Sequence, residues 1–233
     1  MPKELTRLYP EDIARLDPTP MPGWDGVEQR LLARDPDNGS VTARVDVRAG
    51  AAVETASSEG WRETFVLAGA LLLDGRSFAA GAYLCRPPGE GEQAVAAEEG
   101  AVVLQLREVN GALDKPAVAL TAEEVDALPW TQKPDGTPGQ AFEKILTRGP
   151  SGSFARVLRL DGVTPGVALH TYDEDCLVLA GACRVGDETH VAGTYTFNPA
   201  GTPHGPFAFI EPLRCVEFAN HPPEATTAAD SET

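Results

Sequence analysis

The chain has 233 residues and a formal net charge of −16 at pH 7, because 35 Asp and Glu face only 19 Lys and Arg. A chain with this much negative charge binds phosphate backbones and anionic lipids poorly. Neither nucleic acid nor a membrane surface is therefore an expected partner. The hydrophobic share of 42% and the charged share of 23% are those of an ordinary globular protein, which excludes wholesale disorder.

The lack of a long apolar segment and the spacing of the cysteines predict a cytoplasmic protein. The longest apolar run, residues 65–73, is much shorter than the roughly 20 residues of a membrane span. No apolar stretch follows the first residues, so no secretory signal is expected. The four cysteines show no CxxC spacing, which favours a reduced cytoplasmic protein.

The chain contains one unit twice, at an offset of 112 residues. Residues 42–92 set on 154–204 without a gap share 15 identities in 51 positions, and Val-Leu-Ala-Gly-Ala at 66–70 recurs at 178–182. We therefore expect two domains, 8–110 and 120–220, joined by a linker over 108–119. Residues 221–233 are polar and without periodicity, which predicts a flexible tail.

Each unit opens with a helical signal and continues as short strands. In the second unit, Thr121 and Glu124 form a capping-box pattern, and Pro129 ends the helix. The first helix ends before Pro18. Turn residues then separate segments of strand character at intervals of about ten residues, which predicts an all-β sandwich or barrel in each half. These segments are 41–47, 64–67, 101–106, 154–160, 176–179, 193–197 and 213–218.

Two spaced motifs of metal-ligand residue types lie in the second unit. Glu174 follows His170 by four residues and Gly181 follows seven later, and a second motif runs from Gly193 to His204. They resemble the cupin motifs G-x5-H-x-H-x3,4-E-x6-G and G-x5-P-x-G-x2-H-x3-N. The Pro-His-Gly-Pro-Phe run at 203–207 looks most like cupins related to the C-terminal domain of the ChrR anti-sigma factor.

The resemblance covers both halves and departs from the motifs at two positions. Ala168 stands where the first motif has its earlier His, and Ala208 stands where the second has Asn. The resemblance implies a bicupin, with two jelly-roll (double-stranded β-helix) barrels in tandem and a short helix before each. It also implies one divalent metal ion, held only in the C-terminal barrel by His170, Glu174 and His204.

The spacing also has a physical reading. Residues four apart on a flat strand lie about 13 Å from each other, so His170 and Glu174 can share an ion only if the chain bends between them or is helical. Glycines and a proline bracket the segment, so we expect a bend at Tyr172-Asp173. Two imidazoles and a carboxylate leave open coordination positions, which catalysis needs. Fe(II) or Zn is expected first, with Mn and Ni as alternatives. The competing interpretation is a metal-free barrel whose His residues are satisfied polar groups.

Two neighbouring side chains are further catalytic candidates. Tyr172 either contacts substrate or simply packs, and Cys176 either approaches the metal or is a small buried residue. Arg156 recurs as Arg44, which indicates a structural role. His190 and His221 are expected at the surface.

The first unit lacks the ligand residues. At offset 112, Ser58, Arg62 and Glu92 replace His170, Glu174 and His204. We expect an ion pair between Arg62 and Glu92 in place of the metal; the alternative is that both side chains face solvent. Glu63 is one residue out of register and should face the other way.

These observations favour a metal-dependent cupin enzyme acting on a small oxygenated organic molecule, with dioxygenase-like or isomerase- or cyclase-like chemistry. The alternatives are a non-catalytic metal- or ligand-binding sensor of ChrR type, and a scaffold whose N-terminal barrel dimerises around a vestigial pocket. A small-molecule substrate is the expected partner, with a homodimer as one candidate assembly.

Overall fold

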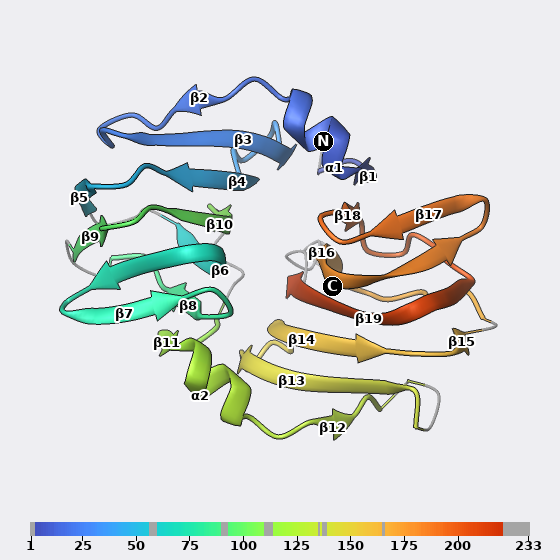
Figure 1. The fold of residues 1–233 in the computed structure, drawn as a ribbon. Coiled ribbons are helices and arrows are strands. Elements are labelled where there is room, and N and C mark those ends of the chain that lie inside the picture. Colours follow the sequence, from blue (N-terminus) through green and yellow to red (C-terminus); the bar gives the residue numbers. More distant parts are fainter. Residues whose placement is uncertain are drawn as a thin grey trace, which may run out of the picture.

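The computed structural model describes residues 3–55, 60–89, 93–109, 114–134, 136, 139–164 and 166–220. It is 57% strand and 6% helix, which confirms the all-β fold class. The strands form two sheets, each folded into a jelly-roll barrel, and the barrels lie side by side in tandem (Figure 1). No described helix is long and apolar enough to cross a membrane.

The strands of the first barrel follow the order β11-β8-β6-β10-β4-β3-β2, with β5, β7 and β9 off this path. Their bounds are β2 Thr19–Pro20, β3 Val27–Arg34, β4 Val41–Val47, β5 Ala51–Thr55, β6 Trp61–Leu73, β7 Arg76–Ala79, β8 Tyr83–Arg86, β9 Gln93–Ala97, β10 Ala101–Glu108 and β11 Val118–Leu120.

The second barrel follows the equivalent order β1-β18-β16-β19-β14-β13-β12, with β15 and β17 off the path. The bounds are β1 Thr6–Leu8, β12 Thr131–Gln132, β13 Ala141–Arg148, β14 Phe154–Leu160, β15 Val163–Thr164, β16 Asp173–Val185, β17 Glu188–Val191, β18 Tyr195–Asn198 and β19 Phe207–Asn220. Every segment expected to be a strand lies in or overlaps one.

A short helix precedes each barrel, as the sequence predicts. Helix α1 is Pro10–Arg15 and helix α2 is Ala122–Ala127. The Thr121 side chain accepts a hydrogen bond from the backbone N–H of Glu124, and the Glu124 carboxylate accepts one from the N–H of Thr121. This capping box satisfies two backbone donors that a helix start leaves without partners.

The repeated Val-Leu-Ala-Gly-Ala segment is where the 13-residue strands β6 and β16 bend. Gly69 in β6 and Gly181 in β16 have φ angles of +67° and +80°. A Cβ at these positions would lie 2.1 Å from the carbonyl oxygen of Gly100 and 2.2 Å from that of Pro212. Only glycine allows this close approach, so the repeat retains it at both positions.

The two barrels exchange their edge strands. Strand β1 precedes the first barrel but pairs with β18 of the second, in the register Thr6↔Phe197. Strand β11 precedes the second barrel but pairs with β8 of the first, in the register Val118↔Cys85. The expected linker over 108–119 therefore ends inside a strand of the first sheet. The expected tail, 221–233, lies outside the described residues.

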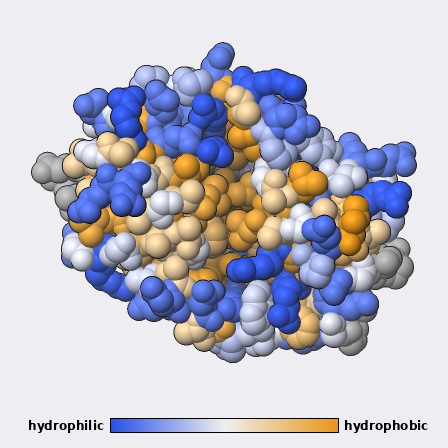
Figure 2. Space-filling view, viewed as in Figure 1, coloured by the Kyte–Doolittle hydropathy of each residue, from blue (hydrophilic) through white to orange (hydrophobic). Residues whose placement is uncertain are grey.

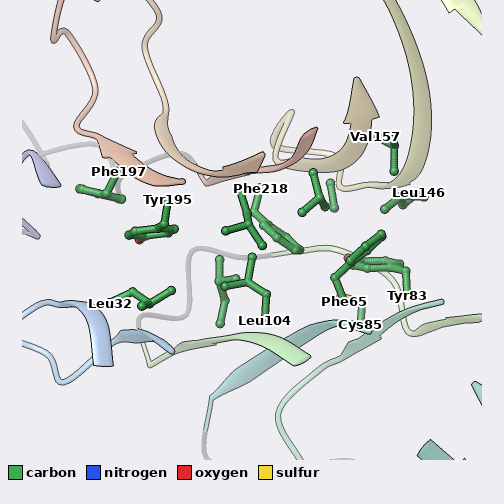
Figure 3. Packing of buried hydrophobic residues seen from close by; sticks show 14 of the residues in the cluster. Leu32, Phe65, Tyr83, Cys85, Leu104, Leu146, Val157, Tyr195, Phe197 and Phe218 are labelled. Carbon is green, nitrogen blue, oxygen red and sulfur yellow. The ribbon is translucent and has the colours of Figure 1, made fainter. Parts of the chain in front are cut away.

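The largest apolar cluster lies between the barrels. Phe65, Tyr83 and Leu104 of the first barrel meet Phe197 and Phe218 of the second (Figure 3). A separate, smaller apolar cluster lies inside each barrel. In Figure 2, apolar residues also gather near the centre of the visible face, over the junction between the two halves in Figure 1. Burial of this shared surface holds the halves together as one body.

Buried Lys115 crosses this junction. Its Nζ lies 2.7 Å from Oε2 of Glu63 in the first barrel and 2.9 Å from Oδ1 of Asn220 in the second. The Tyr83 hydroxyl donates to the other oxygen of Glu63 at 2.5 Å. Glu63 thus faces the second barrel, as its register predicts.

An equivalent network surrounds Lys3, which lies 112 residues before Lys115. Its Nζ lies 2.7 Å from Glu108 of the first barrel and 3.5 Å from Asp175 of the second. Asp175 also accepts hydrogen bonds from Tyr195 at 2.5 Å and from Thr42 at 2.6 Å. Asp175 directly follows Glu174 on β16, so these contacts fix the strand that carries a candidate metal ligand.

Candidate metal centre

Three side chains that are distant in the sequence converge at one end of the second barrel. Glu174 is the second residue of β16, His170 precedes a bend at Thr171-Tyr172, and His204 follows β18. One potential ligand atom from each of the three lies within 4.8 Å of the others. Among the described residues, no other group of three or more His, Cys, Asp or Glu side chains has such geometry. The expected bend therefore exists, one residue earlier than predicted.

Both imidazoles are oriented by backbone carbonyls. Nδ1 of His170 lies 3.2 Å from the carbonyl oxygen of Tyr172, and Nδ1 of His204 lies 3.1 Å from that of Thr202. A carbonyl oxygen can only accept, so each Nδ1 carries the proton and each Nε2 presents a lone pair. The two Nε2 atoms lie 3.2 Å apart.

The Glu174 carboxylate completes the set of acceptors. Its oxygens lie 3.1 Å from Nε2 of His170 and 4.0 Å from Nε2 of His204. Three acceptors this close repel one another unless a proton or a metal cation lies between them. Two imidazole nitrogens and one carboxylate are ligands that Fe(II), Zn, Mn and Ni accept, so the donor set fits a divalent ion.

Neighbouring side chains hold these groups in place. The Asn198 amide donates to Oε1 of Glu174 at 2.8 Å. The Tyr172 ring stacks on His170, with centroids 4.2 Å apart and planes 4° from parallel. Such contacts fix the orientation of a ligand before an ion arrives.

The surroundings shift the pKa of two of the three residues. Burial would lower the pKa of His170, but the hydrogen bond and charge of Glu174 outweigh it and raise that pKa above its ordinary value. Burial would raise the pKa of Glu174, but the hydrogen bond and charge of His170, with the charge of His204, hold it below its ordinary value. The site is therefore prepared to hold positive charge beside an ionised carboxylate.

Ala168 lies at the position of the missing motif His. Its backbone N–H and C=O pair with those of His204 at 2.7 and 3.0 Å. This pairing fixes the backbone of His204. The small side chain contributes no ligand atom and leaves room at the edge of the site.

The cluster opens into a cavity of about 430 Å³ inside the second barrel. The polar part of the wall includes Asn198, Arg156 and Glu217. The remainder is mostly apolar, with Val178, Val185, Leu213, Phe207 and Phe209 among its residues. This volume and wall suit a small organic molecule with an apolar body and an oxygen-bearing end.

Several solved structures share this architecture. A proposed dioxygenase from Nostoc punctiforme PCC 73102 superposes with a TM-score of 0.79 at 19% identity, over 95% of this chain and 84% of that chain. A proposed glyoxylate-induced protein from Pseudomonas aeruginosa gives 0.72 at 16%, over 93% and 88%. Oxalate decarboxylase from Bacillus subtilis gives 0.58 at 14%, over 93% and 77%. At these identities the likeness shows the fold alone.

A sequence model of a protein family also matches part of the chain. Residues 12–109 match the ChrR cupin-like domain. The chain has the cupin fold. The matched segment is the first barrel, whereas the candidate ligands lie in the second. No curated protein matches the chain.

Sequence reasoning did not identify Arg156 as a residue of the cupin cavity. Arg156 is buried, and its guanidinium lies 2.7 Å from the carboxylates of both Glu143 and Glu217. It also lies 3.5 Å from the Tyr172 hydroxyl, which connects it to the ring that stacks on His170.

The equivalence of Arg156 and Arg44 is wrong. Arg156 lies opposite Glu217, whereas Gln105, the equivalent of Glu217, lies opposite Ala43. The true offset in this strand is therefore 113. A slip of one residue moves a side chain to the other face of a sheet, so a gap-free alignment hid the inward position of Arg156.

His190 is also placed differently from its prediction. It is only 6% exposed, it lines the cavity, and its buried Nε2 has no hydrogen-bond partner among the residues that the structure describes. Burial and then the charge of Arg7 lower its pKa. Phe78 occupies the equivalent position in the first barrel, so both barrels bury a ring at this position. His221 lies outside the described residues.

Tyr172 and Cys176 both line the cavity. A hydrogen bond with Cys215 and then burial raise the pKa of the Cys176 thiol well above its ordinary value, so it is a weak ligand as it stands. Catalytic roles for these two residues stay predictions.

The first barrel has a space of about 450 Å³, but it lies away from Arg62, beside Asp46, Arg48 and Glu99. The interior of this barrel holds a space of about 40 Å³ lined by Arg62 and Trp24, among others. Ser58 and Glu92 lie outside the described residues, so the predicted Arg62–Glu92 ion pair stays a prediction.

Proposed function

We propose that this chain is a bicupin that holds one divalent metal ion at His170, Glu174 and His204 and acts on a small oxygenated organic molecule. The reaction class is dioxygenase-like or isomerase- or cyclase-like. The observation that carries the proposal is the convergence of two imidazole lone pairs and one carboxylate in the wall of a cavity of about 430 Å³.

The buried charges support a divalent ion. The carboxylates of Glu143, Glu174 and Glu217 and the guanidinium of Arg156 are all buried in or beside the cavity. Their formal charge is −2. Buried negative charge is costly unless it is offset, and a cation at the cluster would add to the charge that Lys133 supplies from the cavity wall.

The residues of the site would have separate roles in the reaction. A bound divalent ion would act as a Lewis acid that lowers the pKa of a substrate enol or phenol. His170, Glu174 and His204 would hold the ion on one side and leave its other side open to the cavity. Tyr172, stacked on His170 and near Arg156, would contact a substrate placed there. The apolar wall would exclude water from the reacting end.

The activities of the structural neighbours, a proposed dioxygenase and an oxalate decarboxylase, agree with an enzyme of this kind. The apolar part of the wall favours a substrate with a hydrocarbon body, because such a body would be buried there away from water. The expected partner is that small molecule, within the cytoplasm, and a homodimer is one candidate assembly.

Metal analysis tests the site. Purified protein loaded with Zn or Fe(II) is expected to hold about one equivalent, and His204→Ala is expected to lose it because only two of the three ligands remain. His190→Ala is the matched control, since His190 lines the same cavity outside the cluster. Equal metal content in the wild type and His204→Ala would contradict the site.

A substitution at Ala168 is expected to increase the affinity of the site for metal. Ala168→His restores the missing motif residue beside His204, so a fourth ligand should raise Zn affinity by about tenfold or more, or ~1.4 kcal/mol. Chelator competition measures this. Val167→His, at an exposed neighbouring position, should leave the affinity unchanged. An unchanged affinity in Ala168→His would place residue 168 outside the coordination sphere.

A non-catalytic sensor of ChrR type is the second candidate. The match of residues 12–109 to the ChrR cupin-like domain favours it. Turnover of an enol or phenol, or oxygen consumption, by the metal-loaded wild type and not by His204→Ala would favour the enzyme. A tightly bound ion without an exchangeable water would favour the sensor.

A further inference from the structure

Three arginines lie side by side in the first barrel. Across neighbouring strands, Arg62 on β6 lies opposite Arg86 on β8 and opposite Arg107 on β10. In the second barrel, Glu174 occupies the position of Arg62, between Asn198 and Ala219. Like charges directly opposite on a sheet repel each other. Arg107 is exposed and Arg86 has an interaction of its own, so Arg62 is the member whose charge an anion could offset.

Arg62 is the central member of this row. Its guanidinium lies over the Trp24 ring, 5.5 Å from the centroid. Its Nε is buried, and no described residue forms a hydrogen bond with it. Burial and then the charges of Arg86 and Arg107 lower the pKa of Arg62. With the residues that the structure describes, Arg62 forms no ion pair.

The space beside Arg62 limits what could bind. The interior cavity measures about 40 Å³, and its wall includes Arg62, Arg86, Thr64, Gln105 and Trp24. A single water needs roughly 10–15 Å³ on this measure, so the cavity holds a ligand of a few atoms and no organic substrate. A guanidinium presents its N–H groups as a planar fork that matches a carboxylate or phosphate oxygen pair.

We propose that the first barrel binds a small oxyanion, of carboxylate or phosphate chemistry, at Arg62 and Arg86. The two barrels would then bind ligands of opposite charge at equivalent positions, a cation at Glu174 and an anion at Arg62. The anion would offset the charge of Arg62 and stabilise the first barrel. This site is independent of the metal centre, so either can fail without the other.

The test is titration of the full-length wild type with sodium acetate and, separately, with sodium phosphate at constant ionic strength. Calorimetry measures affinity, and Trp24 fluorescence reports on the site because Arg62 lies over that ring. Saturable binding of one anion per chain is expected. Acetate binding alone would assign a carboxylate ligand, and phosphate binding alone would assign a phosphate. An absence of saturable binding of either anion would overturn the proposal.

Variants locate the binding. Arg62→Met is expected to weaken anion binding at least tenfold while keeping or raising the melting temperature without anion, because it relieves repulsion. Arg62→Lys keeps the charge without the planar fork and should weaken binding less. Arg159→Met is the matched control, since Arg159 lies over Trp130 at 5.0 Å in the second half. Equal affinity in the wild type and Arg62→Met would overturn the assignment.

Glu92→Gln separates the proposal from the predicted internal ion pair. If Glu92 neutralises Arg62, the wild type should bind no anion and Glu92→Gln should acquire binding, which would overturn the proposal in favour of the pair. If the site takes an external anion, the wild type and Glu92→Gln should both bind.

Discussion

Replacing Lys115 with Met is expected to lower the free energy of unfolding by about 3–5 kcal/mol. Lys115 is fully buried and Glu63 is 1% exposed, so the substitution leaves a carboxylate inside the protein without its cation. It also removes the donor to Asn220, which connects the first barrel to the second. Urea unfolding at pH 7 measures the loss.

Two further variants show that the loss comes from the buried charge. The double variant Lys115→Met/Glu63→Leu should recover much of the stability, because no charge is left unpaired. Arg76→Met breaks an ion pair with Glu124 in which both side chains are about half exposed, so it should cost less than about 1 kcal/mol. A loss in Lys115→Met as small as that of Arg76→Met would show that the pair does not hold the junction.

Replacing Arg156 with Met is expected to have a similarly large and pH-dependent effect. Burial already raises the pKa of Glu217, and the charge of Arg156 opposes that rise. Without the guanidinium, the folded-state pKa should rise further above the unfolded value. The folded state then binds more protons than the unfolded state, so stability increases as pH falls and decreases as pH rises through the folded pKa.

The measurement is urea unfolding of wild type and Arg156→Met between about pH 5 and pH 8, with chelator present. The deficit of the variant should be largest, about 3–5 kcal/mol, at the alkaline end and should shrink toward the acid end. Arg156→Met/Glu217→Gln should lose much of this pH dependence. A deficit that is the same at every pH would mean that Arg156 acts through packing and not through its charge.

Local sequence patterns predicted the strands and both helices, and the motif spacing in the second unit predicted the three converging side chains. The bend that joins His170 to Glu174 could be predicted because a straight strand would hold them too far apart. The glycine of each Val-Leu-Ala-Gly-Ala segment also has a local cause, since it permits a close backbone approach.

The errors arose where partners come from distant parts of the chain. Arg156 is inward because its strand is shifted by one residue relative to the repeat, which identity counts cannot reveal. His190 is buried because β17 pairs with β16 and brings the ring into the cavity wall, which depends on a partner strand and not on its own segment. Lys3 and Lys115 carry no local signal, since their partners lie across the junction between barrels.

The exchange of β1 and β11 gives the chain the topology of two identical subunits that trade their leading strands and are then joined end to end. In a true dimer of that kind, the shared core would form only as fast as two molecules met, and dilution would dissociate the two subunits. The covalent connection replaces that encounter with an effective concentration set by a short segment of chain. The apolar core between the barrels, and the lysines that cross it, therefore assemble independently of how much protein is present.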